Sequence, residues 1–385
     1  MNDFSFQNPT KIIFGKDTEK CVGPEASKYG KTALVHYGGG SVKKIGVLDK
    51  VIASLKNAGM TVIELGGVKP NPRLSLVREG IELVKKNNVD IIIAVGGGSV
   101  IDSSKAIALG SCYDGDVWDF YFKGIPAEKM LPLGTVLTIP AAGSESSNSS
   151  VITNEDGSYK CGYSSDVTYP KFSVLNPENT YSLPPYQIAC GASDILAHLM
   201  ERYFVNVECV ELTDRLLEGT MKNIIKFAPL AIKNPENYDI RAEVMLTGTY
   251  AHNNSMDVGR GGDWASHNIE HELSGIYDIA HGAGLSIIFP AWMKYVRKTN
   301  PKKLVQFGQR VFDINGLDDE KTIDAAISAL EDFYKSIGVP TRLSEAGIDE
   351  KNFEIMAQKA ARNGAFGSYV KLDKDATVEI YNIAK

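Results

Sequence analysis

One aspartate and several histidines recur at a spacing that suits metal binding. Asp194 and His198 are four residues apart in DILAH, and His267 and His271 are four apart in HNIEH. His281 follows ten residues later, at the start of HGAG. Because residues four apart share one face of a helix, each pair can direct both side chains to one point. Imidazole and carboxylate ligands suit a divalent transition metal such as zinc or iron.

These residues provide more candidate ligands than a catalytic metal site normally needs, so one histidine is available for proton transfer. The HNIEH segment is not the metalloprotease signature, because that motif needs glutamate directly after the first histidine and position 268 is Asn268. His36 and His252 have no partner at such a spacing. We interpret His36 as structural and leave the role of His252 open.

A glycine-rich loop, AVGGGSVIDSSK, stands between a buried apolar run and a helical pattern. Glycine lets backbone approach a phosphate closely, and a helix start offers unpaired N–H groups to an anion. Gly96, Gly97, Gly98 and Ser99 are therefore candidates for a pyrophosphate cradle. The loop is neither a Walker loop nor the usual dinucleotide fingerprint, since Ile101 takes the place of the third glycine. A plain strand-to-helix turn remains an alternative.

An earlier glycine loop, YGGGSVKK, contains Gly38, Gly39 and Ser41 followed by two lysines and no acid. In dinucleotide folds an acid in such a place holds the ribose 2′-hydroxyl, whereas a small or basic loop admits a 2′-phosphate. The loop therefore favours NADP, unless Lys43 and Lys44 are only solvated helix residues. A third loop, TIPAAGSESSNSS, is rich in small and hydroxyl residues and can wrap a cofactor.

The composition is that of an ordinary globular protein. The 385 residues favour two domains, and the net charge of −6 argues against binding to nucleic acid. No run of about 18 apolar residues exists that would span a membrane, and the N-terminus lacks a secretory signal. The five cysteines are scattered with no CxxC, which favours reduced thiols and a cytoplasmic protein.

Strand and helix patterns alternate in the first part of the chain and give way to helical patterns later. Apolar runs at 32–37, 61–65, 90–95 and 134–140 predict strands, and periodic segments at 41–60, 74–87 and 100–109 predict helices. This alternation predicts a parallel sheet covered by helices, an α/β domain over residues 1–180. Helical spacing from Tyr186 onward predicts an all-helical domain over residues 181–385.

The chain resembles the iron-containing (group III) alcohol dehydrogenases over essentially its whole length. The segment GGGSVIDSSK, the pair Asp194 and His198, and the set His267, His271 and His281 carry this resemblance, together with FQNPTKIIFG and DATVEIYNIA. The segments YGGGSVKKIGVLDKV and YDIAHGAGLSIIFPAWMKYV are most similar to the branch of butanol dehydrogenases and NADPH-dependent aldehyde reductases.

The resemblance implies a Rossmann-like dinucleotide-binding domain and a helical domain, in the dehydroquinate synthase-like architecture, with the active site between them. It also implies one divalent metal, iron or zinc, held by Asp194, His198, His267 and His281. His271 matches the family histidine near the nicotinamide, and we expect it to relay a proton between the alkoxide and solvent.

The resemblance implies further cofactor contacts, at Gly96, Gly97, Gly98, Ser99, Asp102, Thr138, Ser144, Ser147 and Lys160. Where the family often has Thr-Thr-x-Gly-Thr, this chain has Ala141, Ala142, Gly143 and Ser144, so some threonine contacts are lost or replaced. The missing acid in the first glycine loop supports NADP(H) as the preferred cofactor, with NAD(H) also admitted.

We expect hydride transfer between the nicotinamide and a carbonyl carbon, with the metal acting as a Lewis acid on the substrate oxygen. No cluster of Arg or Lys lies near the ligand motifs, whereas Trp264, Leu273, Ile276 and Tyr277 are apolar or aromatic. This composition favours uncharged short- to medium-chain alcohols and aldehydes such as butanol and butanal. Some of these side chains can instead serve only to pack the helical core.

Other functions remain open from the sequence. A glycerol dehydrogenase or a dehydroquinate synthase would share the layout, although the latter needs basic residues for a phosphorylated acid. A hydrolase with a metal-activated water would bind no nucleotide, and a non-catalytic metal-binding protein would show no turnover. The family also suggests a homodimer, and the FQNPTKIIF segment has the pattern of a strand that can pair across an interface.

Overall fold

The structure, a computed structural model, describes residues 1–385 and contains two compact units. The sheet unit comprises Gln7–Leu183 and Pro235–Thr249, and the helical unit comprises Met1–Phe6, Pro184–Asn234 and Tyr250–Lys385. A domain boundary at residue 180 stays a prediction. The structure places 235–249 in the sheet unit because polar side chains of that helical segment bond to it. Thr249 Oγ1, for example, donates to Glu145 Oε1 at 2.7 Å.

Six parallel strands form the main sheet, in the order β1-β8-β5-β4-β2-β3. Their bounds are β1 Lys11–Phe14, β2 Thr32–Tyr37, β3 Thr61–Leu65, β4 Ile91–Gly97, β5 Leu133–Ile139 and β8 Phe172–Leu175. The four strands predicted from apolar runs are confirmed as β2, β3, β4 and β5. All seven residues of β4 are buried, as expected of a central strand covered on both faces.

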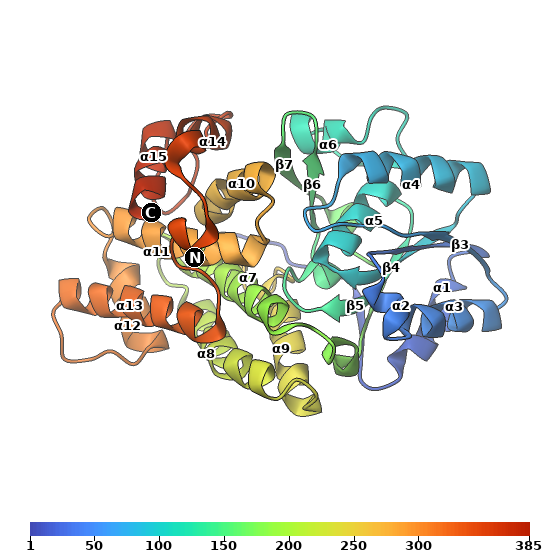
Figure 1. Ribbon diagram of the computed structural model, residues 1–385, viewed down its shortest axis with the longest axis horizontal. Coiled ribbons are helices and arrows are strands. Elements are labelled where there is room, and N and C mark those ends of the chain that lie inside the picture. Colours follow the sequence, from blue (N-terminus) through green and yellow to red (C-terminus); the bar gives the residue numbers. More distant parts are fainter. The chain divides into compact units, whose positions relative to one another are not determined.

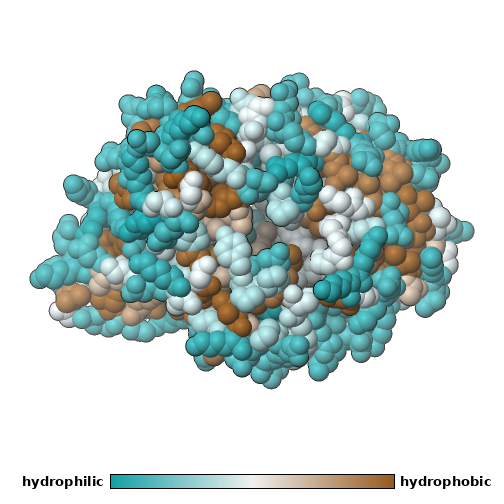
Figure 2. All heavy atoms as spheres, viewed as in Figure 1, coloured by the Kyte–Doolittle hydropathy of each residue, from teal (hydrophilic) through white to brown (hydrophobic).

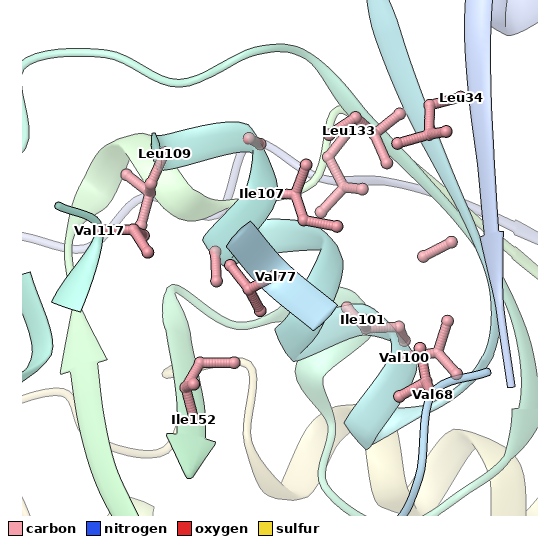
Figure 3. Close-up of a cluster of buried hydrophobic side chains, with 14 of the residues drawn as sticks. Leu34, Val68, Val77, Val100, Ile101, Ile107, Leu109, Val117, Leu133 and Ile152 are labelled. Carbon is pink, nitrogen blue, oxygen red and sulfur yellow. The ribbon is translucent and has the colours of Figure 1, made fainter. Parts of the chain in front are cut away.

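Helices cover both faces of this sheet (Figure 1). The helices of the sheet unit are α1 Val22–Ala26, α2 Ser41–Lys44, α3 Val47–Asn57, α4 Leu74–Asn87, α5 Gly98–Gly110, α6 Trp118–Lys123 and most of α9 Tyr238–Ala251. One apolar core joins Leu34 and Leu133 of the sheet to Val77 of α4 and to Ile101 and Ile107 of α5 (Figure 3). A second core packs α1 and α3 against the opposite face.

The helix predicted over residues 41–60 is two helices, α2 and α3. Gly46 interrupts it with a φ of +75°, in the left-handed region that glycine adopts without strain. An antiparallel hairpin of β6 Ser149–Asn154 and β7 Tyr159–Ser164 was not predicted. Its strands are rich in serine and other polar residues, and only the Asp156-Gly157 turn signals the hairpin in the sequence.

The helical unit contains eight α-helices: α7 Pro185–Tyr203, α8 Glu211–Lys233, α10 Ala265–Tyr277, α11 His281–Val296, α12 Lys302–Val311, α13 Asp319–Ile337, α14 Phe353–Ala360 and α15 Lys374–Ile383. Aromatic rings fill part of its core, where Phe204 packs on Trp292, Phe307 and Tyr369 with centroids 5.3–6.0 Å apart. Helix α7 is buried over most of its length, which makes it a rigid base for the side chains that it carries.

Short 3-10 helices connect these elements: η1 Thr18–Cys21, η2 Ser144–Ser146, η3 Asp166–Thr168, η4 Pro177–Thr180, η5 Ser344–Ala346 and η6 Glu350–Asn352. Hydrophilic residues predominate on the face shown in Figure 2, interrupted by apolar patches. None of the helices combines the length and the apolar character needed to span a bilayer. The five cysteines form no disulfide.

Candidate active site

Helix α7 carries Asp194 and His198 one turn apart, on its buried face. The two residues are 4% and 5% exposed, and Nδ1 of His198 lies 3.5 Å from Oδ1 of Asp194. Burial, together with the neighbouring imidazoles, holds the pKa of His198 well below its ordinary value. His198 is therefore neutral, which leaves a ring nitrogen able to bind a cation.

Helices α10 and α11 bring two further imidazoles to the same carboxylate. Nε2 of His267 lies 3.9 Å from Oδ1 of Asp194, and Nε2 of His281 lies 3.8 Å from it. His281 is the first residue of α11, and Gly282 follows it. A Cβ atom at Gly282 would stand 1.9 Å from the carbonyl oxygen of Cys190. Only glycine therefore lets the start of α11 pack this closely on α7.

Two buried glutamates orient these imidazoles. Nδ1 of His267 lies 2.8 Å from Oε1 of Glu201, and Nδ1 of His281 bonds Oε2 of Glu270. Both carboxylates are essentially unexposed, at 1% and 0%. Because a ring nitrogen that donates to a carboxylate fixes the tautomer, the opposite nitrogen of each ring is left to act as an acceptor or ligand.

Glu201 and Glu270 were not predicted from the sequence as site residues. A signal was present, since each lies three residues after a predicted ligand, His198 and His267, and so shares its helix face.

The arrangement fits one divalent cation. Ligand atoms of Asp194, His267 and His281 all lie within 4.8 Å of one another. Nδ1 of His198 and Nε2 of His267 are buried and have no hydrogen-bond partner. Buried polar atoms in that condition are rare in folded proteins, and a cation bound by Asp194, His267 and His281 would satisfy Nε2 of His267. His198 borders this group but is not among the ligand atoms that lie within 4.8 Å of one another. The mixed oxygen and nitrogen donor set is the kind used by zinc and iron sites.

His271 lies at the margin of this group. Its ring centroid is 5.5 Å from that of His281 and 6.5 Å from that of His267, and it is partly exposed. It also forms a second group with Glu270 and His281, whose ligand atoms lie within 4.8 Å of one another. Glu270 already bonds Nδ1 of His281, so a cation in that second group would compete with this bond. The geometry favours the group centred on Asp194.

A buried arginine, Arg202, lies one turn after His198 on the same helix, α7. Nη1 of Arg202 donates to the carbonyl oxygen of His198 at 3.0 Å, and Nε lies 2.5 Å from Oδ1 of Asp257. The guanidinium stands 4.8 Å from the ring of Trp264. Nη2 lies 3.4 Å from Nδ1 of His252, whose ring centroid is 4.2 Å from that of His198. Because a guanidinium only donates, Nδ1 of His252 is the acceptor in this contact.

The apolar residues near the motifs have different surroundings. The ring of Trp264 meets the ring of His267 edge-on, with the two ring centroids 5.4 Å apart. Trp264 therefore borders the group of histidines around Asp194. Leu273 is fully buried in the helical core and therefore contributes to packing. The hydroxyl of Tyr277 accepts a hydrogen bond from Nδ2 of Asn352.

The second glycine loop forms a close junction between β4 and α5 in the sheet unit. Strand β4 ends at Gly97 and α5 begins at Gly98, with Ser99 in its first turn. A Cβ atom on Gly97 would lie 2.9 Å from Cβ of Ile139, and one on Gly98 would lie 2.7 Å from Cβ of Ala142. The junction leaves no room for side chains, and the N-terminus of α5 is a favourable place for an anion.

The other predicted cofactor residues of the sheet unit are buried. The exposed fractions are 9% for Asp102, 4% for Thr138, 3% for Ser144, 1% for Ser147 and 5% for Lys160. Oδ1 of Asp102 accepts from Ser144 Oγ at 2.6 Å, and Oδ2 accepts from the Val151 amide at 2.9 Å. Asp102 therefore holds the loop that follows β5.

The first glycine loop lies next to an acid that the sequence analysis did not identify. Gly39 and Gly40 border open space, and Nζ of Lys43 stands 4.9 Å from the ring of Tyr37. The Tyr37 hydroxyl donates to Oε2 of Glu64 at 3.2 Å. The loop itself contains no acid, but the parallel pairing of β2 with β3 brings Glu64 beside it. Pairing of strands distant in the sequence is not visible in a local motif.

His36 is fully buried in β2. Its Nδ1 lies 2.8 Å from the carbonyl oxygen of Leu65, and its Nε2 lies 2.9 Å from Oγ of Ser103. These contacts agree with the structural role expected for it.

Comparisons with known proteins match both parts of the chain. The family model described as iron-containing alcohol dehydrogenase matches residues 9–177. The model described as the C-terminal region of the Fe-containing alcohol dehydrogenase family matches residues 188–384. The "Probable NADH-dependent butanol dehydrogenase 1" of Bacillus subtilis is 44% identical over 382 residues, covering 99% of each chain. The "NADPH-dependent aldehyde reductase YqhD" of Escherichia coli is 38% identical over 390 residues, covering 100% of both.

A solved structure is similar over the same extent. The crystal structure of NADH-dependent butanol dehydrogenase A from Thermotoga maritima superposes with a TM-score of 0.97 at 42% identity. The similarity covers 100% of this chain and 99% of that one.

Proposed function

Because the chain belongs to the iron-containing alcohol dehydrogenase family, we propose that it interconverts short- to medium-chain alcohols and aldehydes, with NADP(H) as the preferred cofactor. Its class is that of a metal-dependent, NAD(P)-dependent alcohol dehydrogenase or aldehyde reductase. The observation that carries the proposal is the convergence of His267 and His281 on Asp194, within 3.9 Å of its Oδ1 atom.

The divalent cation would be held by Asp194, His198, His267 and His281. The ion, zinc or iron, supplies Lewis-acid polarisation of the substrate oxygen, and neither metal needs to change its oxidation state. Glu201 and Glu270 keep His267 and His281 in the orientation that this binding requires.

His271 is the proposed proton relay. It stands beside His281 with its ring partly exposed, so it can exchange a proton with solvent. Hydride transfer to an aldehyde leaves an oxygen that must gain a proton, and an imidazole titrates in the range suited to that task.

The dinucleotide would bind to the sheet unit. Gly96, Gly97, Gly98 and Ser99 would receive the pyrophosphate at the start of α5. Gly38, Gly39 and Ser41 would lie against the adenosine end, and further contacts would come from Asp102, Thr138, Ser144, Ser147 and Lys160.

The preference for NADP(H) rests on the first glycine loop. Lys43 offers a cation there, and the small residues leave open space for a 2′-phosphate. Glu64 opposes this preference, because a carboxylate accepts from a 2′-hydroxyl and repels a phosphate. NAD(H) is therefore also admitted, and relatives of the chain bear names of both kinds, NADH-dependent and NADPH-dependent.

Butanal and butanol are the proposed model substrates. The names of the relatives as butanol dehydrogenase and aldehyde reductase support this class. Trp264, beside the imidazole group, adds an aromatic surface suited to an uncharged substrate.

We also propose a homodimer. Strand β1 is an edge strand whose outer side carries unpaired backbone groups, and its Ile12 and Phe14 are 37% and 38% exposed. A second copy pairing there would cover this edge. Light scattering coupled to size exclusion would give twice the mass of one chain.

A spectrophotometric assay tests the proposed activity. Protein supplied with zinc or ferrous ion is mixed with butanal and either NADPH or NADH, and the nicotinamide absorbance is followed. The proposal expects a loss of absorbance that stops on addition of chelator, with NADPH the faster cofactor. Absence of any loss with both cofactors and several aldehydes would refute it.

A further inference from the structure

Lys105 is a fully buried lysine in the middle of α5, the helix that begins at the second glycine loop. Its Nζ donates to the carbonyl oxygens of Ser147 and Ser149 at 2.8 Å and 2.7 Å, and lies 3.5 Å from Oγ of Ser147. An ammonium group has three donor hydrogens, so these acceptors can use its full capacity. Lys105 is therefore bonded to the end of the connection between β5 and β6 and to the first residue of β6, and not to solvent.

Asp102, one turn earlier on α5, bonds the same segment at its two ends. Its carboxylate accepts from Ser144 Oγ and from the Val151 amide, while Lys105 donates between these points. One face of one helix thus holds residues 144–151 through side chains of opposite charge. This relationship fixes where the Ser144 and Ser147 hydroxyls stand relative to the glycine junction.

The segment that these side chains hold is buried, which is unusual for a loop. Ser144, Glu145, Ser146 and Ser147 are each no more than 3% exposed. Backbone carbonyls in such a place need donors, and the carbonyls of Ser147 and Ser149 obtain them from Lys105. Without the ammonium group, the buried carbonyl of Ser147 and the part-buried carbonyl of Ser149 would lose this partner, which would favour a rearrangement of the segment.

The charge of Lys105 is costly to bury. Burial lowers its pKa to about 8, although the carboxylates of Asp102 and Glu145 act in the opposite direction. Removing the lysine alone would leave the buried carboxylates of Asp102 and Glu145 without the cation that attracts them, and loss of one partner of a buried charge pair is strongly destabilising. Lys105 is therefore coupled both to these carboxylates and to the backbone of the segment that it bonds.

We propose that Lys105 is a positioning residue for the dinucleotide. It sets the conformation of residues 144–149, and through them the affinity for the cofactor, without touching the cofactor itself. This inference rests on the proposed function, in which Ser144 and Ser147 contact the dinucleotide. It assigns to Lys105 a role in cofactor binding that is separate from the metal group of the helical unit.

Lys105→Met, which keeps the length and removes the donors, tests the inference. Binding of NADPH and NADH to metal-free protein is measured by the fluorescence of the bound nicotinamide. We expect an affinity about tenfold weaker than that of the wild type, since small displacements of positioning groups have effects of this size or larger. In the assay, the cofactor KM should rise by a similar factor while the butanal KM and metal content hold.

His36→Gln is the matched control. His36 is buried in the same unit and lies 2.9 Å from Ser103 of the same helix, but its contacts do not include residues 144–151. It should lower the thermal midpoint, as is also expected of Lys105→Met, and leave cofactor affinity unchanged. A loss of affinity in both variants would mean that general destabilisation is the cause, and would overturn the inference.

Two measurements guard against a variant that does not fold. Lys105→Gln retains one donor group, and its affinity should fall between those of the wild type and Lys105→Met. In the wild type, NADPH should slow hydrogen exchange of the amides at 144–151. Unchanged exchange, or wild-type affinity in a folded Lys105→Met, would contradict the inference. Wild-type protein that binds no nucleotide would instead contradict the proposed function.

Discussion

Glu201 Oε1 lies 2.8 Å from Nδ1 of His267, on the side of the ring opposite the nitrogen that faces Asp194. The same glutamate oxygen also accepts from the His267 amide at 2.9 Å. Glu201 thereby holds His267 through both its imidazole ring and its backbone amide. An imidazole that is fixed in this way is ready to bind a cation without prior reorientation.

Glu201→Gln should therefore weaken metal binding. An amide cannot accept from Nδ1 with the strength of a carboxylate, and loss of such orienting groups typically costs about 10–100-fold in metal affinity. The affinity for zinc can be measured by competition with a chromogenic chelator.

Glu272→Gln is the control for this variant. Glu272 is buried on the same helix as Glu270, but it pairs with Lys359 at 3.3 Å and Arg362 at 3.6 Å. Its substitution should lower stability and leave zinc affinity as in the wild type. Equal losses of zinc affinity in both variants would show that Glu201 has no specific orienting role.

His271→Ala should lower turnover and retain the metal. The physical reason is that His271 is not part of the group formed by Asp194, His267 and His281. The ring centroids of His271 and His267 are 6.5 Å apart. Metal content per chain is measured by mass spectrometry, with His267→Ala as the comparison that loses the ion. Loss of the ion from His271→Ala would favour the group formed by Glu270, His271 and His281.

Glu64→Gln should shift cofactor preference toward NADPH by a factor of about 2–5, the scale of an exposed charge interaction. The change removes a negative charge beside the loop that contains Lys43, where a 2′-phosphate would bind. Lys43→Met should shift the preference the opposite way. The ratio of kcat/KM for the two cofactors reports both, and identical ratios in all three proteins would place the ribose elsewhere.

The free energy of unfolding should decrease as the pH is lowered, because the buried His36 resists protonation in the folded state. Burial lowers its pKa to about 4 from an ordinary value near 6.5, so the folded state disfavours the protonated ring. The unfolded chain takes up a proton below pH 6.5 and the folded chain only near pH 4. The free energy of unfolding therefore declines between these values, by about 3 kcal/mol at most.

Urea unfolding at pH 7.5, 5.5 and 4.5 measures this decline, and His36→Gln should show a shallower one. Equal slopes in the two proteins would assign the acid sensitivity to other groups.

The strand and helix pattern of the sheet unit could be predicted because β4 and its neighbours are continuous apolar runs bounded by glycine. The hairpin of β6 and β7 could not, because its strands are polar and their pairing is set by contacts such as that between Val151 and Asp102. Similarly, α2 and α3 have one apolar periodicity, and only the backbone conformation of Gly46 separates them.

The candidate metal group could be proposed from the sequence for a different reason. One of its pairs, Asp194 and His198, lies within a single helix, where a spacing of four residues already implies a shared face. The bonds of Glu201 to His267 and of Glu270 to His281, and the approach of Glu64 to Tyr37, depend on how separate elements pack. Such contacts are properties of the tertiary structure, and a single sequence does not reveal them.

The most direct test of the metal-dependent activity is one titration. Wild-type protein and Asp194→Ala are stripped with chelator and dialysed, and zinc or ferrous ion is then added stepwise while the reduction of butanal by NADPH is followed. We expect wild-type activity to rise and saturate at one ion per chain, and Asp194→Ala to stay inactive without binding the ion. Full activity of the stripped wild type, or metal-restored activity in Asp194→Ala, would contradict this assignment.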